Sequence, residues 1–141
     1  MTQPVNVLQA AEFVIPDEAE LLWRQIPLAF IHNGQVGSDA FRPTPKDDGK
    51  LSTRRASKIS AEDAYWDHVG RLGLQSEGTM PLSVGDLKEL GIRAIDDSAL
   101  PGSPAAHAYG DFRNLSKNRA KDVARRLKPM ALRRGFAFRR T

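Results

Sequence analysis

The segment from residue 117 to residue 134 has the most regular pattern in this sequence. Its apolar side chains recur at helical spacing and form one stripe, while nearly every other position is Lys or Arg. All other apolar runs are a few residues long and are bounded by Gly, Pro or polar residues. The chain is therefore expected to combine short elements with one long basic helix near its end. The apolar stripe consists of Ala120, Val123, Ala124, Leu127, Met130 and Ala131.

The remaining segments alternate between helical and strand patterns. Helices are predicted at 17–26, 60–73 and 83–90, each beginning at a residue that can cap a helix. Residues 39–44 and 50–54 are candidates for a pair of edge strands. Further short strands are predicted at 28–31, 74–80, 92–95, 107–112 and 136–140. This order predicts an α+β fold with a small mixed or antiparallel sheet and about four helices, the last long and basic.

The composition fits a single domain over residues 1–141, since 40% hydrophobic and 27% charged residues are ordinary for a globular chain. We expect an acidic body at 12–95, a loop at 96–104 and a basic end at 107–140. The absence of Cys excludes disulfides and Cys-ligated zinc and agrees with a reducing compartment. No apolar run is long enough to span a membrane. These observations predict a cytoplasmic protein with no membrane partner.

Charge is separated along the chain. Residues 1–110 hold 10 Lys or Arg against 15 Asp or Glu, a balance of −5, and residues 111–141 hold 11 against 2, a balance of +9. Such a basic segment predicts an anionic partner, most commonly nucleic acid, and a scarcity of Asn and Gln favours contacts to the phosphate backbone. The predicted contact residues are Lys117, Arg119, Lys121, Arg125, Arg126, Lys128, Arg133, Arg134, Arg139 and Arg140.

The same separation of charge has a second interpretation. An acidic body and a basic helix are complementary surfaces, so the chain would alternatively be a protein-interaction or regulatory component. Its partner would then be another protein or a second copy of this chain. Steep salt dependence with an anionic polymer would favour the nucleic-acid interpretation over this one.

Four residues support a second alternative, a small enzyme acting on a phosphate-bearing or nucleotide substrate. His107 and Asp111 would share one face of a strand, where a carboxylate can orient an imidazole for acid–base work. Arg42 and Ser52 lie in a segment dense in Arg and hydroxyl groups, which suit a phosphate. No Gly-x-Ser-x-Gly elbow or Walker loop occurs. Since the three histidines form no local metal-ligand pair, no metal and no cofactor is expected, and a binding module is favoured over an enzyme.

Three stretches resemble motifs in small bacterial proteins of unknown function. They are the run from Phe41 to Ser52, the run from His107 to Phe112, and the run from Arg133 to Phe136. The resemblance covers most of the chain and implies no particular activity. It implies that the Arg- and hydroxyl-rich segment, together with His107 and Asp111, is where a site should be sought.

Overall fold

The computed structural model describes residues 7–140, and within them an antiparallel sheet has the strand order β1-β7-β8-β5-β2-β6-β9. A separate pair, β3 and β4, forms a small hairpin around Asn33 and Gly34. The predicted α+β class with an antiparallel sheet is confirmed. The strands are β1 (Phe13–Val14), β2 (Leu21–Gln25), β3 (Ile31–His32), β4 (Gln35–Val36), β5 (Lys50–Arg55), β6 (Gly78–Ser83), β7 (Ala94–Asp96), β8 (His107–Asp111) and β9 (Phe138–Arg139).

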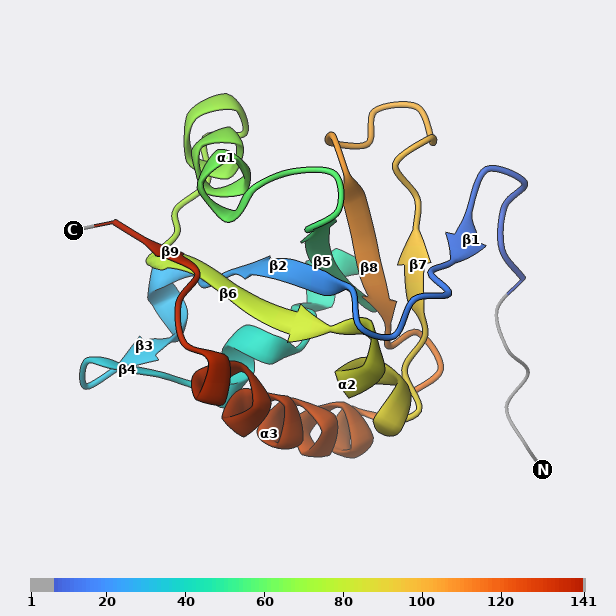
Figure 1. Cartoon of the computed structure of the whole chain (residues 1–141). Coiled ribbons are helices and arrows are strands. Elements are labelled where there is room, and N and C mark those ends of the chain that lie inside the picture. The colour runs from blue at the N-terminus through green and yellow to red at the C-terminus, as the bar shows by residue number, and fades with distance from the viewer. Residues whose placement is uncertain (1–6, 141) are drawn as a thin grey trace.

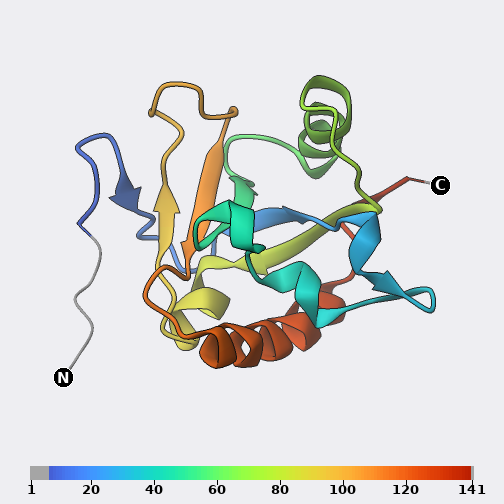
Figure 2. The same ribbon diagram turned by 180° about the vertical axis from the view of Figure 1, so that it is seen from behind.

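Helices cover the two faces of the sheet unequally. The long helix α3 (Lys117–Arg134) and the short helix α2 (Val84–Glu89) lie below the sheet in Figure 1, and α1 (Ala61–Trp66) lies above it, as the view from behind also shows (Figure 2). A π-helical segment, η4 (Asp67–Arg71), continues α1. Three 3-10 turns complete the described helical elements: η1 (Leu28–Phe30), η2 (Ser38–Phe41) and η3 (Pro45–Asp47).

The predicted starts of three helices are confirmed by their caps. The hydroxyl of Ser60 accepts a hydrogen bond from the backbone of Asp63, and that of Ser116 accepts one from the backbone of Arg119. Ser83 and Asp86 form a reciprocal capping box at α2. Each side chain satisfies a backbone N–H that the first helical turn leaves without a partner.

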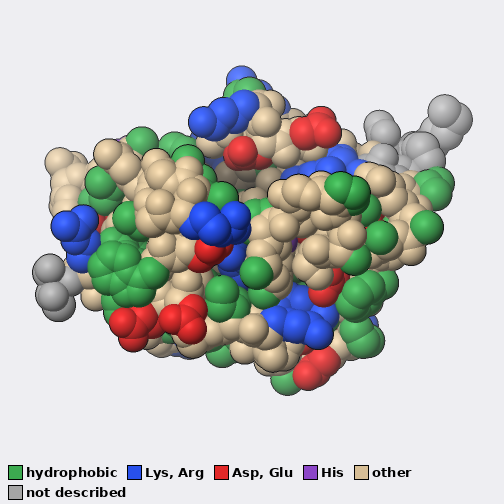
Figure 3. Space-filling model, turned by 90° about the horizontal axis from the view of Figure 1, so that it is seen from above, with side chains coloured by type: hydrophobic (Ala, Val, Ile, Leu, Met, Phe, Trp, Pro, Cys, Tyr) green, Lys and Arg blue, Asp and Glu red, His purple; other side chains and the backbone are tan. Residues whose placement is uncertain are grey.

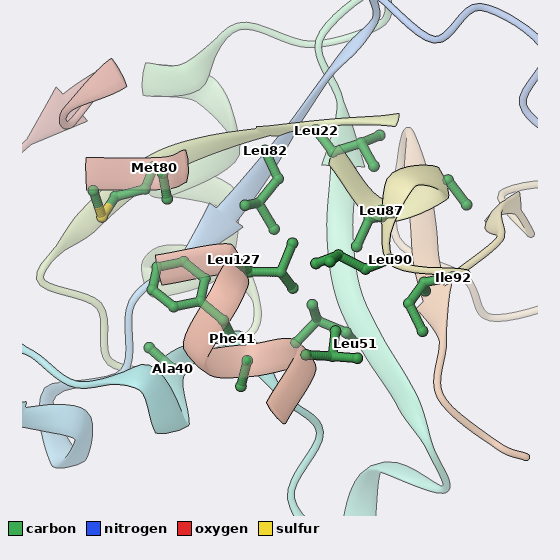
Figure 4. Packing of buried hydrophobic residues seen from close by; sticks show 14 of the residues in the cluster. Leu22, Ala40, Phe41, Leu51, Met80, Leu82, Leu87, Leu90, Ile92 and Leu127 are labelled. Atoms are coloured by element: carbon green, nitrogen blue, oxygen red, sulfur yellow. The ribbon is translucent and has the colours of Figure 1, made fainter. Parts of the chain in front are cut away.

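The main core lies between α3 and the sheet. Leu127 of α3 is fully buried together with Phe41 of η2, Leu51 of β5, and Met80 and Leu82 of β6 (Figure 4). The buried side chains of α3 include small alanines, which allow the helix to approach the sheet closely. The predicted apolar stripe of this helix is therefore its packing face.

Three sequence predictions for residues 17–54 are wrong. Residues 17–26 contain the strand β2, with partners on both sides, rather than a helix, because its burial and its pairing with β5 and β6 outweigh the local capping pattern. Residues 39–44 and 50–54 do not pair with each other: the first segment folds largely into η2, and β5 pairs with β2 and β8. The segment predicted as a strand at 28–31 is mostly the 3-10 turn η1.

Candidate active site

A cleft opens where two central strands separate. β2 and β5 pair only at Leu22 with Arg55 and at Trp23 with Arg54, whereas β5 pairs with β8 over its first five residues. Beyond Trp23 the space beside β5 is a cavity of about 630 Å³, a size suited to a small-molecule ligand. Its walls come from the end of β2, η1, η3, β5, the segment at 72–75 and the end of the loop before β8. Figure 3 shows this side of the molecule from above, with acidic and basic side chains around a depression in the surface.

Three side chains form a continuous hydrogen-bonded row at one wall of the cleft. The Oγ atom of Ser52 lies 2.8 Å from Nε2 of His107, and Nδ1 of His107 lies 2.6 Å from Oδ1 of Asp97. Because a carboxylate only accepts, the neutral imidazole carries its proton on Nδ1 and donates it to Asp97. Nε2 then accepts the hydroxyl proton of Ser52. This is the arrangement of nucleophile, base and orienting acid found in hydrolases with a Ser-His-Asp triad.

Neighbouring strands and a closed loop bring the three residues together. Antiparallel pairing places Arg54 opposite His107 and Ser52 opposite Tyr109, so Ser52 and His107 share a sheet face as diagonal neighbours. Asp97 follows β7 directly and begins the loop that ends at His107. The carbonyl of Asp97 accepts hydrogen bonds from the Leu100 backbone and the Ser103 hydroxyl, which hold the loop closed.

Burial differs along the row in the way a nucleophile requires. Ser52 is exposed to solvent, whereas the side chains of His107 and Asp97 are only 14% and 10% exposed. The hydroxyl is therefore open to a substrate while its two supporting groups are shielded. A shielded hydrogen bond of this kind is screened little by water and keeps its geometry.

The cleft is also lined by cationic side chains. Arg54 binds Asp67 at 2.8 Å and donates to the carbonyl of Ala105, so it joins η4 to the loop before β8. Arg24 crosses the gap between the separating strands and donates to the carbonyls of Ala40 and Ser52 at 2.8 and 3.0 Å. This second bond fixes the backbone of the candidate nucleophile from the side opposite His107.

His68 of η4 lines the same cleft in its neutral form. Burial, together with the nearby guanidinium groups of Arg24 and Arg54, lowers the pKa of His68 to about 4. The cations that line the cleft, Arg24, Lys46 and Arg54, give it a positive local potential. The cleft is therefore suited to an anionic ligand.

The structure unites only part of the set of catalytic candidates predicted from sequence. Ser52 and His107 meet, but Asp111 does not serve His107: it binds Arg93 and Arg113 instead. Arg42 follows η2 and is not among the residues that line the cleft. The orienting carboxylate is Asp97, which sequence reasoning placed in a loop and did not consider.

Arg24 and His68 were also missed as site residues. The sequence pattern predicts helices at 17–26 and 60–73, so it marks neither Arg24 nor His68 as part of a site. Of these residues, only Asp97 could have been identified from nearby sequence. An acidic residue directly after one strand can contact a histidine at the start of the next, ten residues later, when the connecting loop folds back.

The predicted nucleic-acid contacts fall into two groups. Arg119 and Arg126 bind Asp122, Arg134 binds Asp86 of α2, and Arg139 binds Glu77. These four arginines therefore have structural partners. For the others, no carboxylate within 4 Å is found among residues 7–140: Lys117, Lys121, Arg125, Lys128, Arg133 and Arg140.

Residues 7–140 contain neither a cluster of metal ligands nor a helix able to span a membrane. No cluster of three or more His, Asp or Glu side chains is arranged to hold a metal ion there. In the same part of the chain, no helix combines the length and apolarity needed to cross a membrane. Comparisons with protein-family models, curated proteins and solved structures gave no match to this chain.

Proposed function

We propose that this protein is a hydrolase or acyltransferase that uses Ser52 as a covalent nucleophile. The observation that carries the proposal is the unbroken row Ser52–His107–Asp97, with contacts of 2.8 and 2.6 Å, at the wall of a ligand-sized cleft. Hydroxyl groups are weak nucleophiles at neutral pH, and an adjacent oriented imidazole is what activates them. The sequence favours a binding module over an enzyme, and that prediction stays untested; our proposal departs from it because of this row of side chains.

The reaction follows from the direction of the two hydrogen bonds. Oγ of Ser52 attacks an acyl carbon as its proton passes to Nε2 of His107, and Asp97 stabilises the imidazolium that forms. His107 then returns the proton to the leaving oxygen or nitrogen as its bond to the acyl carbon breaks. Water, or another acceptor, attacks the acyl-Ser52 ester by the same proton route and restores the hydroxyl.

Labelling with a fluorophosphonate tests the nucleophile without knowledge of the natural substrate. Oγ of an activated serine displaces fluoride, so an O–P bond forms, the P–F bond breaks, and the serine proton passes to His107. We expect one label on the wild-type chain, located at Ser52 by peptide mass spectrometry. We expect none in Ser52→Ala, and a rate at least about a hundred-fold lower in His107→Gln.

A matched control distinguishes activation from mere exposure. Ser38 lies on η2 and does not line the cleft, so Ser38→Ala should be labelled at the wild-type rate. A native circular-dichroism spectrum for each variant excludes unfolding as the cause of lost labelling. If Ser52 reacts no faster than Ser38, or equally fast in His107→Gln, the proposal is wrong.

A second candidate function rests on the solvent face of α3. Lys117, Lys121, Arg125, Lys128 and Arg133 have no carboxylate within 4 Å in the described part of the chain, and an 18-residue helix spans about 27 Å. Such a row of cations supports contact with successive phosphates of a nucleic acid, or with an acidic protein surface. Fluorescence anisotropy with labelled DNA and RNA at about 50 and 200 mM salt tests it. Loss of binding in a Lys121→Ala, Arg125→Ala, Lys128→Ala triple variant is expected if the row is the contact.

A further inference from the structure

Arg24 is a buried cation without an acidic partner. It is 9% exposed, and its hydrogen bonds go to two neutral carbonyls, those of Ala40 and Ser52. Within residues 7–140, no carboxylate lies within 4 Å of its guanidinium. Burial lowers the pKa of Arg24 to about 10, so the side chain remains charged at neutral pH.

The other two buried arginines of the sheet show what Arg24 lacks. Arg54 binds Asp67 at 2.8 Å, and Arg55 binds both Glu20 at 2.6 Å and Asp96 at 2.8 Å. Burying a charge is costly unless an opposite charge compensates it. Arg24 therefore leaves a positive charge at the cleft that no carboxylate of the described residues contacts, and only Asp47 attracts it, from beyond ion-pair distance.

The surroundings of Arg24 indicate the kind of group that would complete the site. The exposed Lys46 lies at the same cleft, and the nearest acid, Asp47, is held by the backbone and hydroxyl of Thr44 at 2.7 Å. His68 is neutral and contributes no charge of its own. The cleft thus offers cationic donors to an incoming anion.

The rim of the cleft is apolar. Leu28, Leu72 and Leu74 are 43%, 37% and 48% exposed, and all three line the cleft. Exposed leucines gathered at one opening mark a surface that an apolar group covers on binding. A ligand that fills the cleft would combine an anionic group with an apolar part.

We propose that Arg24 binds a phosphate group of the substrate, an ester whose apolar part lies against Leu28, Leu72 and Leu74. A phosphate offers several oxygens to share between the guanidinium of Arg24 and the ammonium of Lys46, whereas a carboxylate offers two. The assignment of this group to a substrate, and not to a separate ligand, rests on the proposed function, because Arg24 binds the backbone of Ser52.

Isothermal titration calorimetry with phenyl phosphate, benzoate and inorganic phosphate tests the binding site. Phenyl phosphate should bind more tightly than inorganic phosphate because of its ring, and more tightly than benzoate because of its charge. Arg24→Gln should weaken phenyl phosphate binding about 10- to 100-fold, as expected for a lost charge-assisted hydrogen bond. Lys46→Gln, an exposed change, should weaken it less. The control Lys88→Gln on α2, where the lysine pairs with the exposed Glu18 and does not line the cleft, should bind as the wild type does.

A measurement on the wild-type chain does not depend on whether Arg24→Gln folds. A phosphate bound to Arg24 offsets the positive charge that depresses protonation of His68. The NMR titration of the His68 ring should therefore move to higher pH when phenyl phosphate is present. The ring of His32, which pairs with Asp39 on the hairpin side, serves as the internal control and should not move.

These experiments test the phosphate site and the nucleophile independently of each other. Ser52→Ala should bind phenyl phosphate as tightly as the wild type, even though it cannot be labelled. Absence of fluorophosphonate labelling with intact phenyl phosphate binding would refute the nucleophile but keep the phosphate site. The phosphate site would be overturned if phenyl phosphate did not bind, or if benzoate bound equally well. It would also be overturned if Arg24→Gln kept the wild-type affinity and the ligand left the NMR titration of His68 unchanged.

Discussion

At the scale of single residues, the orientation of one imidazole decides what the cleft can do. Asp97 accepts the Nδ1 proton of His107 and so leaves Nε2 free to accept from Ser52. An amide in place of this carboxylate presents an N–H group to Nδ1 and favours the opposite tautomer. In the proposed mechanism Asp97 is therefore a positioning residue that acts only through His107.

We expect Asp97→Asn to fold normally and to lower the rate of fluorophosphonate labelling by about a hundred-fold or more, because the imidazole then carries its proton toward Ser52. Stopped labelling followed by mass spectrometry gives the rate. Asp111→Asn serves as control, since Asp111 binds Arg93 and Arg113 and not His107. Equal losses in the two variants would contradict the role given to Asp97.

His68 makes stability depend on pH at the cleft. Its pKa is about 4 in the folded chain, chiefly because of burial, and about 6.5 in an unfolded chain. The unfolded chain therefore takes up the proton first as the pH falls. The stabilising effect of a neutral His68 is complete above about pH 6.5 and is lost progressively toward pH 4.

We expect the free energy of unfolding to fall more steeply in the wild type than in His68→Gln between pH 6.5 and pH 4.5. The difference should be about 1–2 kcal/mol, because the ring keeps part of its contact with water. Urea unfolding at several pH values measures it. Parallel pH profiles for the two chains would show that His68 is not the group responsible.

At the scale of elements, the parts predictable from sequence are those fixed by neighbouring residues. The helix at 117–134 and the caps at Ser60, Ser83 and Ser116 depend on contacts within one turn, and all are found in the structure. The local pattern predicts a helix where β2 lies. The segment is a strand because it pairs with β5 and β6, which are distant in the sequence. The site has the same origin: Ser52 meets His107 only because β5 and β8 pair across 55 residues.

The cap of α3 gives a test at this scale. Ser116→Ala removes the acceptor for the backbone N–H of Arg119 and should lower the free energy of unfolding by about 1 kcal/mol. Lys117→Ala, one residue further on at an exposed position, should change it by less than about 0.5 kcal/mol. Chemical denaturation of both variants decides between a real cap and a side chain without energetic effect.

At the scale of the whole molecule, one buried ion cluster joins three strands of the sheet. Arg55 of β5 binds Glu20 just before β2 and Asp96 of β7, and these side chains are 11%, 7% and 3% exposed. The hydrogen bond from Arg55 lowers the pKa of Glu20. Burial raises the pKa of Asp96, but hydrogen bonds from Ser98 and Arg55 outweigh it and lower that pKa as well. Asp96 directly precedes Asp97, so this cluster also anchors the start of the loop that carries the orienting carboxylate.

Removing Arg55 should therefore affect the entire sheet. Arg55→Met leaves two buried carboxylates without their cation and should lower the free energy of unfolding by about 3–5 kcal/mol at neutral pH. Arg71→Met, which breaks the exposed pair with Asp67, should lower the free energy of unfolding far less, because water screens that pair. Thermal and urea unfolding compare the two, and Arg55→Lys, which keeps the charge, provides an intermediate case if Arg55→Met does not fold.

The same cluster sets how the molecule responds to acid. Since the pKa values of Glu20 and Asp96 are depressed in the folded state, the stability they contribute is present above their unfolded values, near pH 4. It is lost as the pH falls through the lower folded values. The wild-type chain should thus lose stability steeply below about pH 4, and Arg55→Lys, with a weaker hold on both carboxylates, should lose less over that interval. If the free energy of unfolding falls equally with pH in the two chains, other carboxylates govern acid unfolding. The cluster would then connect the strands without making stability depend on pH.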